Sequence, residues 1–153
     1  MYQLDGKAVV VTGATSGIGL TAVKKFAKAG AFVVGVGRSQ ARNQAAKEEI
    51  QSTIPDGRID FLLADLALQS EVNSLVDTIS KLFKMNHQRQ LDVLVNNAGL
   101  YLERKNMTVD GIEKTFAVNH LAPFLLTHGL MPLLEKASFG RVLTVSSYSH
   151  RTT

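Results

Sequence analysis

The stretch Ala8-Val-Val-Val-Thr-Gly-Ala-Thr-Ser-Gly-Ile-Gly19 decides the fold of this chain. It begins with an apolar run rich in β-branched residues, which is typical of a strand covered on both faces of a parallel sheet. Three glycines follow: Gly13, Gly17 and Gly19. A glycine-rich turn lets the backbone approach a phosphate without a Cβ clash, and the free N–H groups of a following helix favour negative charge. The stretch therefore predicts nucleotide binding, with a purely structural turn as the alternative.

Strands and helices alternate along the rest of the chain. Hydrophobic periodicity predicts helices at 18–29 (closed by Gly30), 40–52, 72–83 and about 110–136. Pro123 and Pro132 should bend or interrupt the last of these helices. Short apolar runs predict further strands at 32–36, 59–64, 91–95 and 142–145. This alternation predicts an α/β fold, a doubly wound parallel sheet with helices on both faces and ligands at the carboxyl ends of its strands.

The composition is that of an ordinary globular chain. At 153 residues, 45% of them hydrophobic and 20% charged, we expect one domain covering residues 1–153. No apolar run approaches the roughly 18–20 residues of a membrane helix, and the N-terminus has no signal-peptide pattern. The chain has no cysteine, so a cytoplasmic location or an organelle matrix fits best. The net charge is +4, but the basic residues are not interleaved with aromatic residues, which favours a solvated surface over a nucleic-acid site.

Polar segments follow the later strands in order. Asp65-Leu66 follows the third strand, Asn96-Asn-Ala-Gly99 the fourth and Ser147 the fifth, and Asn119 lies in the last helix. Together with the glycine-rich turn, these segments resemble the motifs of the short-chain dehydrogenase/reductase family over essentially the whole chain. The resemblance implies a Rossmann-like sheet with strand order 3-2-1-4-5. It also implies hydride transfer between a nicotinamide cofactor and a small-molecule alcohol or carbonyl substrate.

The resemblance assigns roles to individual residues. Ser147 resembles the serine that hydrogen-bonds the substrate oxygen, and Asn119 the residue that steadies a proton-relay water. The stretch Val118-Asn-His-Leu121 is most similar to the retinol-dehydrogenase-like branch of the family. By the same resemblance, the cofactor-binding residues are Gly13, Thr15, Ser16, Gly17, Ile18, Gly19, Arg38, Asp65, Leu66, Asn97, Ala98 and Gly99.

Each polar residue also has a structural interpretation that the sequence leaves open. Asp65 could cap a turn at the end of its strand. Asn96 and Asn97 could bond the backbone between strands. Ser147 could simply end a buried strand, and Asn119 could satisfy the polar groups of a helix kink.

The end of the second strand bears on the choice of cofactor. An acidic residue there would accept hydrogen bonds from the adenosine ribose and repel a 2′-phosphate. This chain has Gly37 at that position, followed by Arg38, whose guanidinium can hold a phosphate through two charge-assisted hydrogen bonds. We therefore expect NADP(H) rather than NAD(H), with an exposed loop arginine as the alternative.

The catalytic Tyr-x-x-x-Lys pair of the family is expected on the helix after the fifth strand. Tyr101 and Lys105 match the bare pattern but precede Ser147, so we interpret them as a chance match. We therefore expect residues 1–153 to be an incomplete domain that lacks its C-terminal elements, exposes apolar surface and is inactive alone. The alternative is a naturally shortened, catalytically silent protein that binds cofactor, regulates or dimerises.

Two further patterns are interpreted as structural. The last predicted helix carries an apolar stripe, which predicts core packing or, by resemblance, a homodimer face: Leu121, Phe124, Leu125, Leu130 and Leu134. The four histidines are too scattered for a metal site: His87, His120, His128 and His150.

Overall fold

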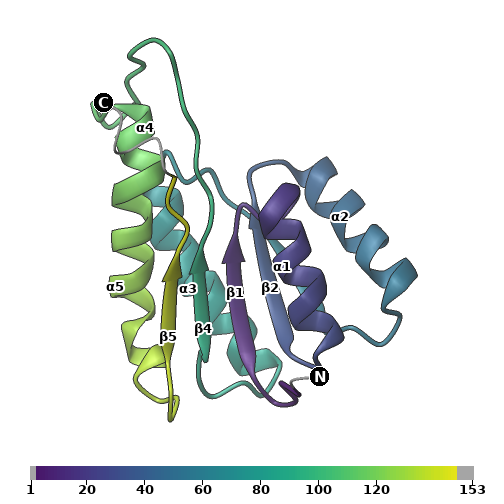
Figure 1. The fold of residues 1–153 in the computed structure, drawn as a ribbon. Coiled ribbons are helices and arrows are strands. Elements are labelled where there is room, and N and C mark those ends of the chain that lie inside the picture. The colour runs from purple at the N-terminus through teal and green to yellow at the C-terminus, as the bar shows by residue number, and fades with distance from the viewer. Residues whose placement is uncertain (1–2, 148–153) are drawn as a thin grey trace.

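A computed structural model of the chain describes residues 3–147. Five parallel strands form one sheet in the order β3-β2-β1-β4-β5, which confirms the predicted Rossmann-like architecture (Figure 1). The strands are β1 Ala8–Thr12, β2 Phe32–Gly37, β3 Ile59–Leu63, β4 Val93–Asn96 and β5 Arg141–Thr144. β1 and β2 are buried along their whole length, as expected of central strands in a sheet covered on both faces.

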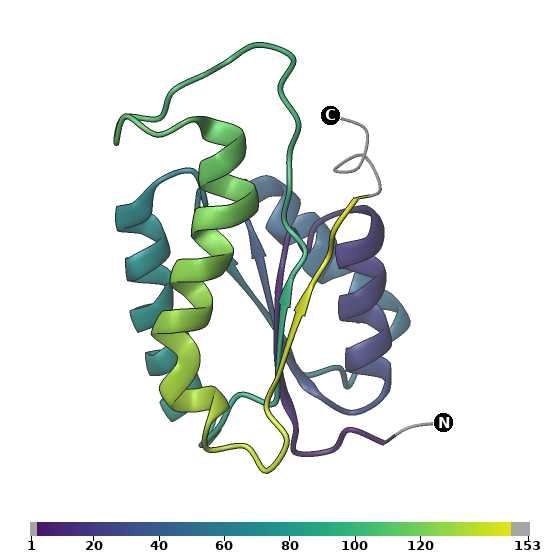
Figure 2. The same ribbon diagram turned by 60° about the vertical axis from the view of Figure 1, so that its left-hand side comes forward.

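Helices cover both faces of the sheet, as Figure 2 shows with the sheet seen nearly edge-on. One face packs against α1 Gly17–Lys28 and α2 Gln40–Thr53, and the other against α3 Gln69–Met85 and α5 Ala122–Leu134. The predicted amphipathic pattern of α3 is confirmed, because its periodic apolar residues are buried: Val72, Leu75, Ile79 and Phe83. Apolar strands thus alternate with amphipathic helices, and their packing forms two cores, one on each side of the sheet.

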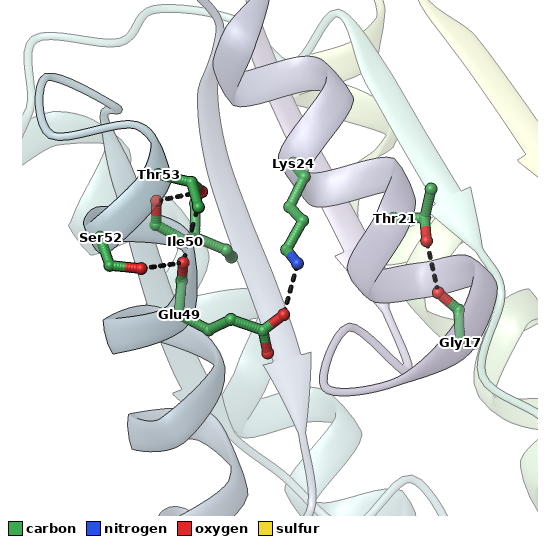
Figure 3. A network of polar contacts seen from close by, with 7 residues as sticks. All are labelled: Gly17, Thr21, Lys24, Glu49, Ile50, Ser52 and Thr53. Carbon is green, nitrogen blue, oxygen red and sulfur yellow. Dashed lines mark hydrogen bonds and ion pairs between the residues drawn. The ribbon is translucent and has the colours of Figure 1, made fainter.

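Polar contacts link α1 to α2 on their shared face of the sheet (Figure 3). The Nζ of Lys24 on α1 forms an ion pair with the carboxylate of Glu49 on α2. At the end of α2, the Oγ of Ser52 donates to the carbonyl oxygen of Glu49 at 2.9 Å, and the Oγ1 of Thr53 donates to that of Ile50 at 3.0 Å. These hydroxyls bond back to carbonyl groups in the preceding turn, and the carbonyl oxygen of Ile50 also accepts from the N–H of Ile54 at 2.8 Å.

The last helical region begins later and is less regular than predicted. Residues 110–113 are not helical, and α4 Lys114–Phe116 continues into a π-helical turn, η1 Ala117–Leu121, before α5. The π-helical turn precedes Pro123, which has no N–H to donate to the carbonyl four residues earlier. The carboxylate of Glu113 caps the start by accepting from the N–H groups of Thr115 at 3.0 Å and Phe116 at 2.8 Å. These two bonds hold the pKa of Glu113 below its ordinary value.

The apolar stripe predicted as core on this helix is only partly buried. Leu130 and Leu134 lie in the core, as predicted. The prediction is wrong for Phe124, which is 61% exposed and stacks on His128 with parallel rings 6.3 Å apart. The buried residues of α5 recur every four positions, at Ala122, Leu126, Leu130 and Leu134, and Phe124 is two positions from the first two, so its side chain lies on the other side of the helix.

The edge strand β5 is exposed over its whole length. Val142, Leu143 and Val145 are each more than 40% exposed, so apolar surface is present here as predicted. Within the described residues, no helix is both long enough and apolar enough to cross a bilayer.

Candidate functional site

The glycine-rich turn joins β1 to α1 at the carboxyl edge of the sheet. Gly13 and Gly17 have positive φ angles of 64° and 52°, a conformation that other residues rarely adopt. A Cβ on Gly13 would lie 2.9 Å from the Cα of Ala98, and one on Gly19 would collide with the carbonyl oxygen of Gly13. A Cβ on Gly17 would meet nothing within 4 Å. Two glycines therefore let the turn pack tightly, and the third lies where the N-terminus of α1 is open.

Thr12 ties this turn to the segment after β4. Its Oγ1 accepts hydrogen bonds from the backbone N–H groups of Asn97 and Ala98, both at 3.0 Å, and donates to the carbonyl oxygen of Val95. The side-chain Nδ2 of Asn97 donates in return to the carbonyl oxygens of Thr12 at 2.9 Å and Gly13 at 3.3 Å. The predicted structural role of Asn97 is thus observed. Thr12 was missed as a site residue, although a hydroxyl at the end of a strand before a glycine turn could have indicated it.

A cavity of about 480 Å³ opens at the carboxyl edge of the central strands. Eight of the predicted cofactor-binding residues line it: Gly13, Thr15, Ser16, Arg38, Asp65, Leu66, Ala98 and Gly99. The cavity wall does not include the other four, Gly17, Ile18, Gly19 and Asn97. Gly37, which the sequence indicated as the position that bears on cofactor choice, also lines the cavity, and the sequence assigned no role to the remaining six: Val36, Ser39, Arg42, Ala64, Leu100 and Val118.

Two cationic side chains stand at the β2 end of the cavity. Arg38 follows β2 directly, and Arg42 lies in the first turn of α2; both are exposed. Nearby, the Oδ1 of Asp65 accepts from the N–H of Ala67 at 3.0 Å, so the turn-capping interpretation of Asp65 is observed. The cavity therefore has a positive end beside β2 and a carboxylate, already engaged with backbone, beside β3.

Asn119 lies in the π-helical turn and faces the segment that leaves β4. Its Oδ1 accepts from the N–H of Leu100 at 2.9 Å, and its Nδ2 donates to the carbonyl oxygen of Leu100 at 2.8 Å. Asn96, by contrast, points to the other side, with its Nδ2 donating to the Oγ1 of Thr127 at 3.2 Å. Asn119 thus fixes a cavity-lining residue, and Asn96 connects β4 to α5.

Ser147 lies three residues beyond β5 at the same edge of the sheet. The N–H of Val145 donates to the carbonyl oxygen of Asn96 at 3.0 Å, which keeps the chain beside β4 just before Ser147. Ser147 is exposed, and β5 is not the buried strand that its structural interpretation required. Tyr101 is 83% exposed and does not line the cavity, in keeping with a chance match of the Tyr101–Lys105 pattern. Tyr148, at the next position, lies outside the described residues.

A second hollow of about 450 Å³ lies between the C-terminal ends of α1 and α2, beside the contacts of Figure 3. Lys24, Lys25 and Lys28 line it, but it is away from the carboxyl edge where a doubly wound sheet binds ligands. Among residues 3–147, no three His, Cys, Asp or Glu side chains are grouped to hold a metal ion. The cavity at the carboxyl edge is therefore the candidate site.

Comparisons with known proteins agree with this geometry. The family model described as "short chain dehydrogenase" matches residues 7–152. The chain is 41% identical to "Dehydrogenase/reductase SDR family member 12" of Bos taurus over 145 residues, which are 95% of this chain and 44% of that protein. It is 35% identical to "Retinol dehydrogenase 12" of Bos taurus over 148 residues, which are 97% of this chain and 45% of that protein. The chain thus spans less than half the length of these two relatives.

A solved structure shares the fold closely. It is a short chain dehydrogenase from Burkholderia cenocepacia in complex with NADP, with a TM-score of 0.79 and 30% identity. The match covers 99% of this chain and 60% of that one. The fold of this chain therefore also occurs in a protein of related sequence that was solved with NADP.

Proposed function

The chain belongs to the short chain dehydrogenase family, and on that premise we propose that it acts as an NADP(H)-dependent oxidoreductase on a small alcohol or carbonyl compound. The observation that carries this proposal is the cavity in which the glycine turn, Arg38 and the segment Ala98–Gly99 meet. A nicotinamide cofactor would supply or accept the hydride. The chain's own residues would bind the cofactor and orient the substrate through hydrogen bonds.

The residues present fit such a group. Gly17 leaves the N-terminus of α1 open, where free N–H groups and the helix dipole favour a diphosphate. Gly37 presents no carboxylate beside the cavity, and Arg38 and Arg42 supply positive charge there. This arrangement supports NADP(H) over NAD(H), because a 2′-phosphate gains charge-assisted hydrogen bonds and meets no like charge.

In the proposed reaction Ser147 donates a hydrogen bond to the substrate oxygen, on which negative charge grows during reduction. A hydroxyl held beyond β5 is at the edge where the cavity opens, which supports this role. Asn119 acts by holding Leu100, and so keeps this part of the cavity wall in place. One relative is named a retinol dehydrogenase, so a retinoid-like or other lipophilic carbonyl compound is the first substrate class to test.

A second function is favoured by the exposed aromatic residues on the outer side of the last helical region. Phe116 is 53% and Phe124 is 61% exposed, an arrangement suited to contact with a second chain. A catalytically silent, dimerising or regulatory protein would use the same cavity for cofactor binding alone. Turnover separates the two functions, since both predict cofactor binding.

The test is calorimetry with NADPH and NADH on the whole polypeptide that carries residues 1–153, followed by NADPH oxidation with a panel of aldehydes and ketones. We expect tighter binding of NADPH, and a loss of turnover of about 100–1,000-fold in Ser147→Ala with little change in NADPH affinity. Ser146→Ala is the matched control. A folded polypeptide that binds neither cofactor would exclude the proposed function.

A further inference from the structure

Gly37, the last residue of β2, lies in the cavity wall and is backed by Asn43 of α2. Asn43 is only 3% exposed, and its Nδ2 donates to the carbonyl oxygens of Gly37 at 3.3 Å and Leu62 at 3.0 Å. Its Oδ1 is buried without a hydrogen-bond partner among the described residues. A Cβ built on Gly37 would collide with this Oδ1. The space beside Gly37 is thus already filled by an amide oxygen.

Two groups crowd that space, and they differ in how easily they could move. The Cγ2 of Thr15 would lie 2.6 Å from the added Cβ, but Thr15 is half-buried beside an open cavity, where rotation of its side chain can relieve the contact. The amide of Asn43 is held by two hydrogen bonds inside the protein. Exchanging its O and N would aim the oxygen at two carbonyl groups, so the amide has one favourable orientation. Asn43 is therefore the group that prevents a side chain at position 37.

We infer that Asn43 determines cofactor specificity, because it keeps position 37 without a side chain. An acidic residue at this end of β2 would bond the adenosine ribose and repel a 2′-phosphate. While Asn43 occupies the space behind Gly37, that acidic residue cannot be accommodated. Asn43 acts through Gly37 as a positioning residue and touches no ligand. The inference rests on the proposed function, since it concerns which nicotinamide cofactor the cavity accepts.

The first test compares cofactor affinities in the whole polypeptide for wild type, Gly37→Asp, Asn43→Ala and the double variant. Asn43→Ala alone should keep the preference for NADPH, because Gly37 and Arg38 are unchanged. The double variant should bind NADH at least about 10-fold more tightly than Gly37→Asp, and its NADPH-to-NADH affinity ratio should fall about 100-fold below wild type. A merely structural role of Asn43 would weaken both cofactors alike and leave their ratio unchanged.

The second test adds only the Cβ and reads thermal unfolding, so it holds even if the aspartate variants fail to fold. Gly37→Ala should lower the unfolding midpoint of the wild type by about 3–10 °C, the effect of overpacking a filled site. In an Asn43→Ala background the same change should lower the unfolding midpoint by less than half as much. Gln44→Ala, which removes the neighbouring exposed amide of α2, is the matched background. In it, Gly37→Ala should lower the unfolding midpoint as much as in the wild type.

The outcomes separate this inference from the proposed function. If the wild type binds NADPH but Gly37→Asp alone gains NADH as fully as the double variant, Asn43 has no part in specificity. Equal costs of Gly37→Ala in the wild-type and Asn43→Ala backgrounds would overturn it as well. If the folded wild type binds neither cofactor, the proposed function fails, and the inference about specificity fails with it.

Discussion

Asn119 holds Leu100 by both of its backbone polar groups, with the N–H donating to Oδ1 at 2.9 Å and the carbonyl oxygen accepting from Nδ2 at 2.8 Å. A primary amide can make this pair of bonds because it carries a donor and an acceptor on one carbon. The π-helical turn that contains Asn119 is thereby joined to the cavity wall after β4. The irregular turn thus contributes Val118 to the cavity wall directly and holds Leu100 there through Asn119.

Asn119→Asp should release this segment although the side chain keeps its size. The carboxylate cannot donate to the carbonyl oxygen of Leu100 and places negative charge against it. A net hydrogen bond is worth about 0.5–1.5 kcal/mol, so we expect the amide of Leu100 to exchange with solvent about 2–10-fold faster. Hydrogen exchange followed by NMR measures this, with Asn106→Asp in the same loop as the control. Unchanged protection of Leu100 in Asn119→Asp would contradict the role of the pair.

Thr12→Val should destabilise the protein more than Thr12→Ser. Valine has nearly the shape of threonine but leaves the N–H of Ala98 without its acceptor, whereas the N–H of Asn97 keeps the carbonyl oxygen of Val95 at 3.1 Å. An unsatisfied buried donor costs about 1–3 kcal/mol, so the free energy of unfolding should fall by at least that amount. Serine retains the hydroxyl and should lower the free energy of unfolding by less. Urea denaturation of the three proteins tests this, and equal losses for valine and serine would refute it.

Arg38→Asp should shift cofactor preference toward NAD(H). The change removes a phosphate partner and places a negative charge at the β2 end of the cavity. A hydrogen bond to a charged group is worth about 1.5–3 kcal/mol, so NADPH affinity should fall by at least about 10–150-fold while NADH affinity falls less. Arg89→Asp changes the net charge equally before β4, outside the cavity lining, and serves as the control. An unchanged preference would exclude Arg38 as the selector.

Glu113 should make the start of the last helical region sensitive to acid. Hydrogen bonds from the N–H groups of Thr115 and Phe116 lower its pKa from the ordinary value of 4.5. Because the folded pKa is lower than the unfolded one, the cap is fully stabilising above pH 4.5 and is lost as pH falls through the folded pKa. Glu113→Gln should remove this pH dependence. A carboxyl NMR titration of Glu113 at its ordinary value would contradict the expectation.

Much of the fold could be predicted because the strands and the glycine turn are encoded locally. The run Ala8–Val11, the three glycines and the period of α3 each specify their own element, and the parallel strand order is observed as the family resemblance implied. Phe124 was misplaced because α5 is apolar on several sides, and its buried residues, Ala122, Leu126, Leu130 and Leu134, lie on a side that Phe124 does not share.

The site was less predictable because some of its roles depend on contacts between distant residues. Thr12 meets Asn97 across 85 positions of sequence, and the hydroxyl at the end of its strand does not by itself identify that partner. Asn43 shares the buried stripe of α2 with Ala46 and Ile50, a spacing that suggests burial. It does not tell which backbone the amide would meet, and that information lies in the packing of α2 against β2 and β3.

The two cores of the sheet are completed by very different lengths of chain. The core under α1 and α2 takes all but one of its buried members, Val95, from residues 9–59. The core under α3 and α5 extends from Ala8 to Leu134. During vectorial synthesis on the ribosome, the first core can therefore assemble while the second still lacks its closing helix. A nascent chain at that stage would have one packed core and one sheet face with exposed apolar side chains, which is the state that a chaperone would bind.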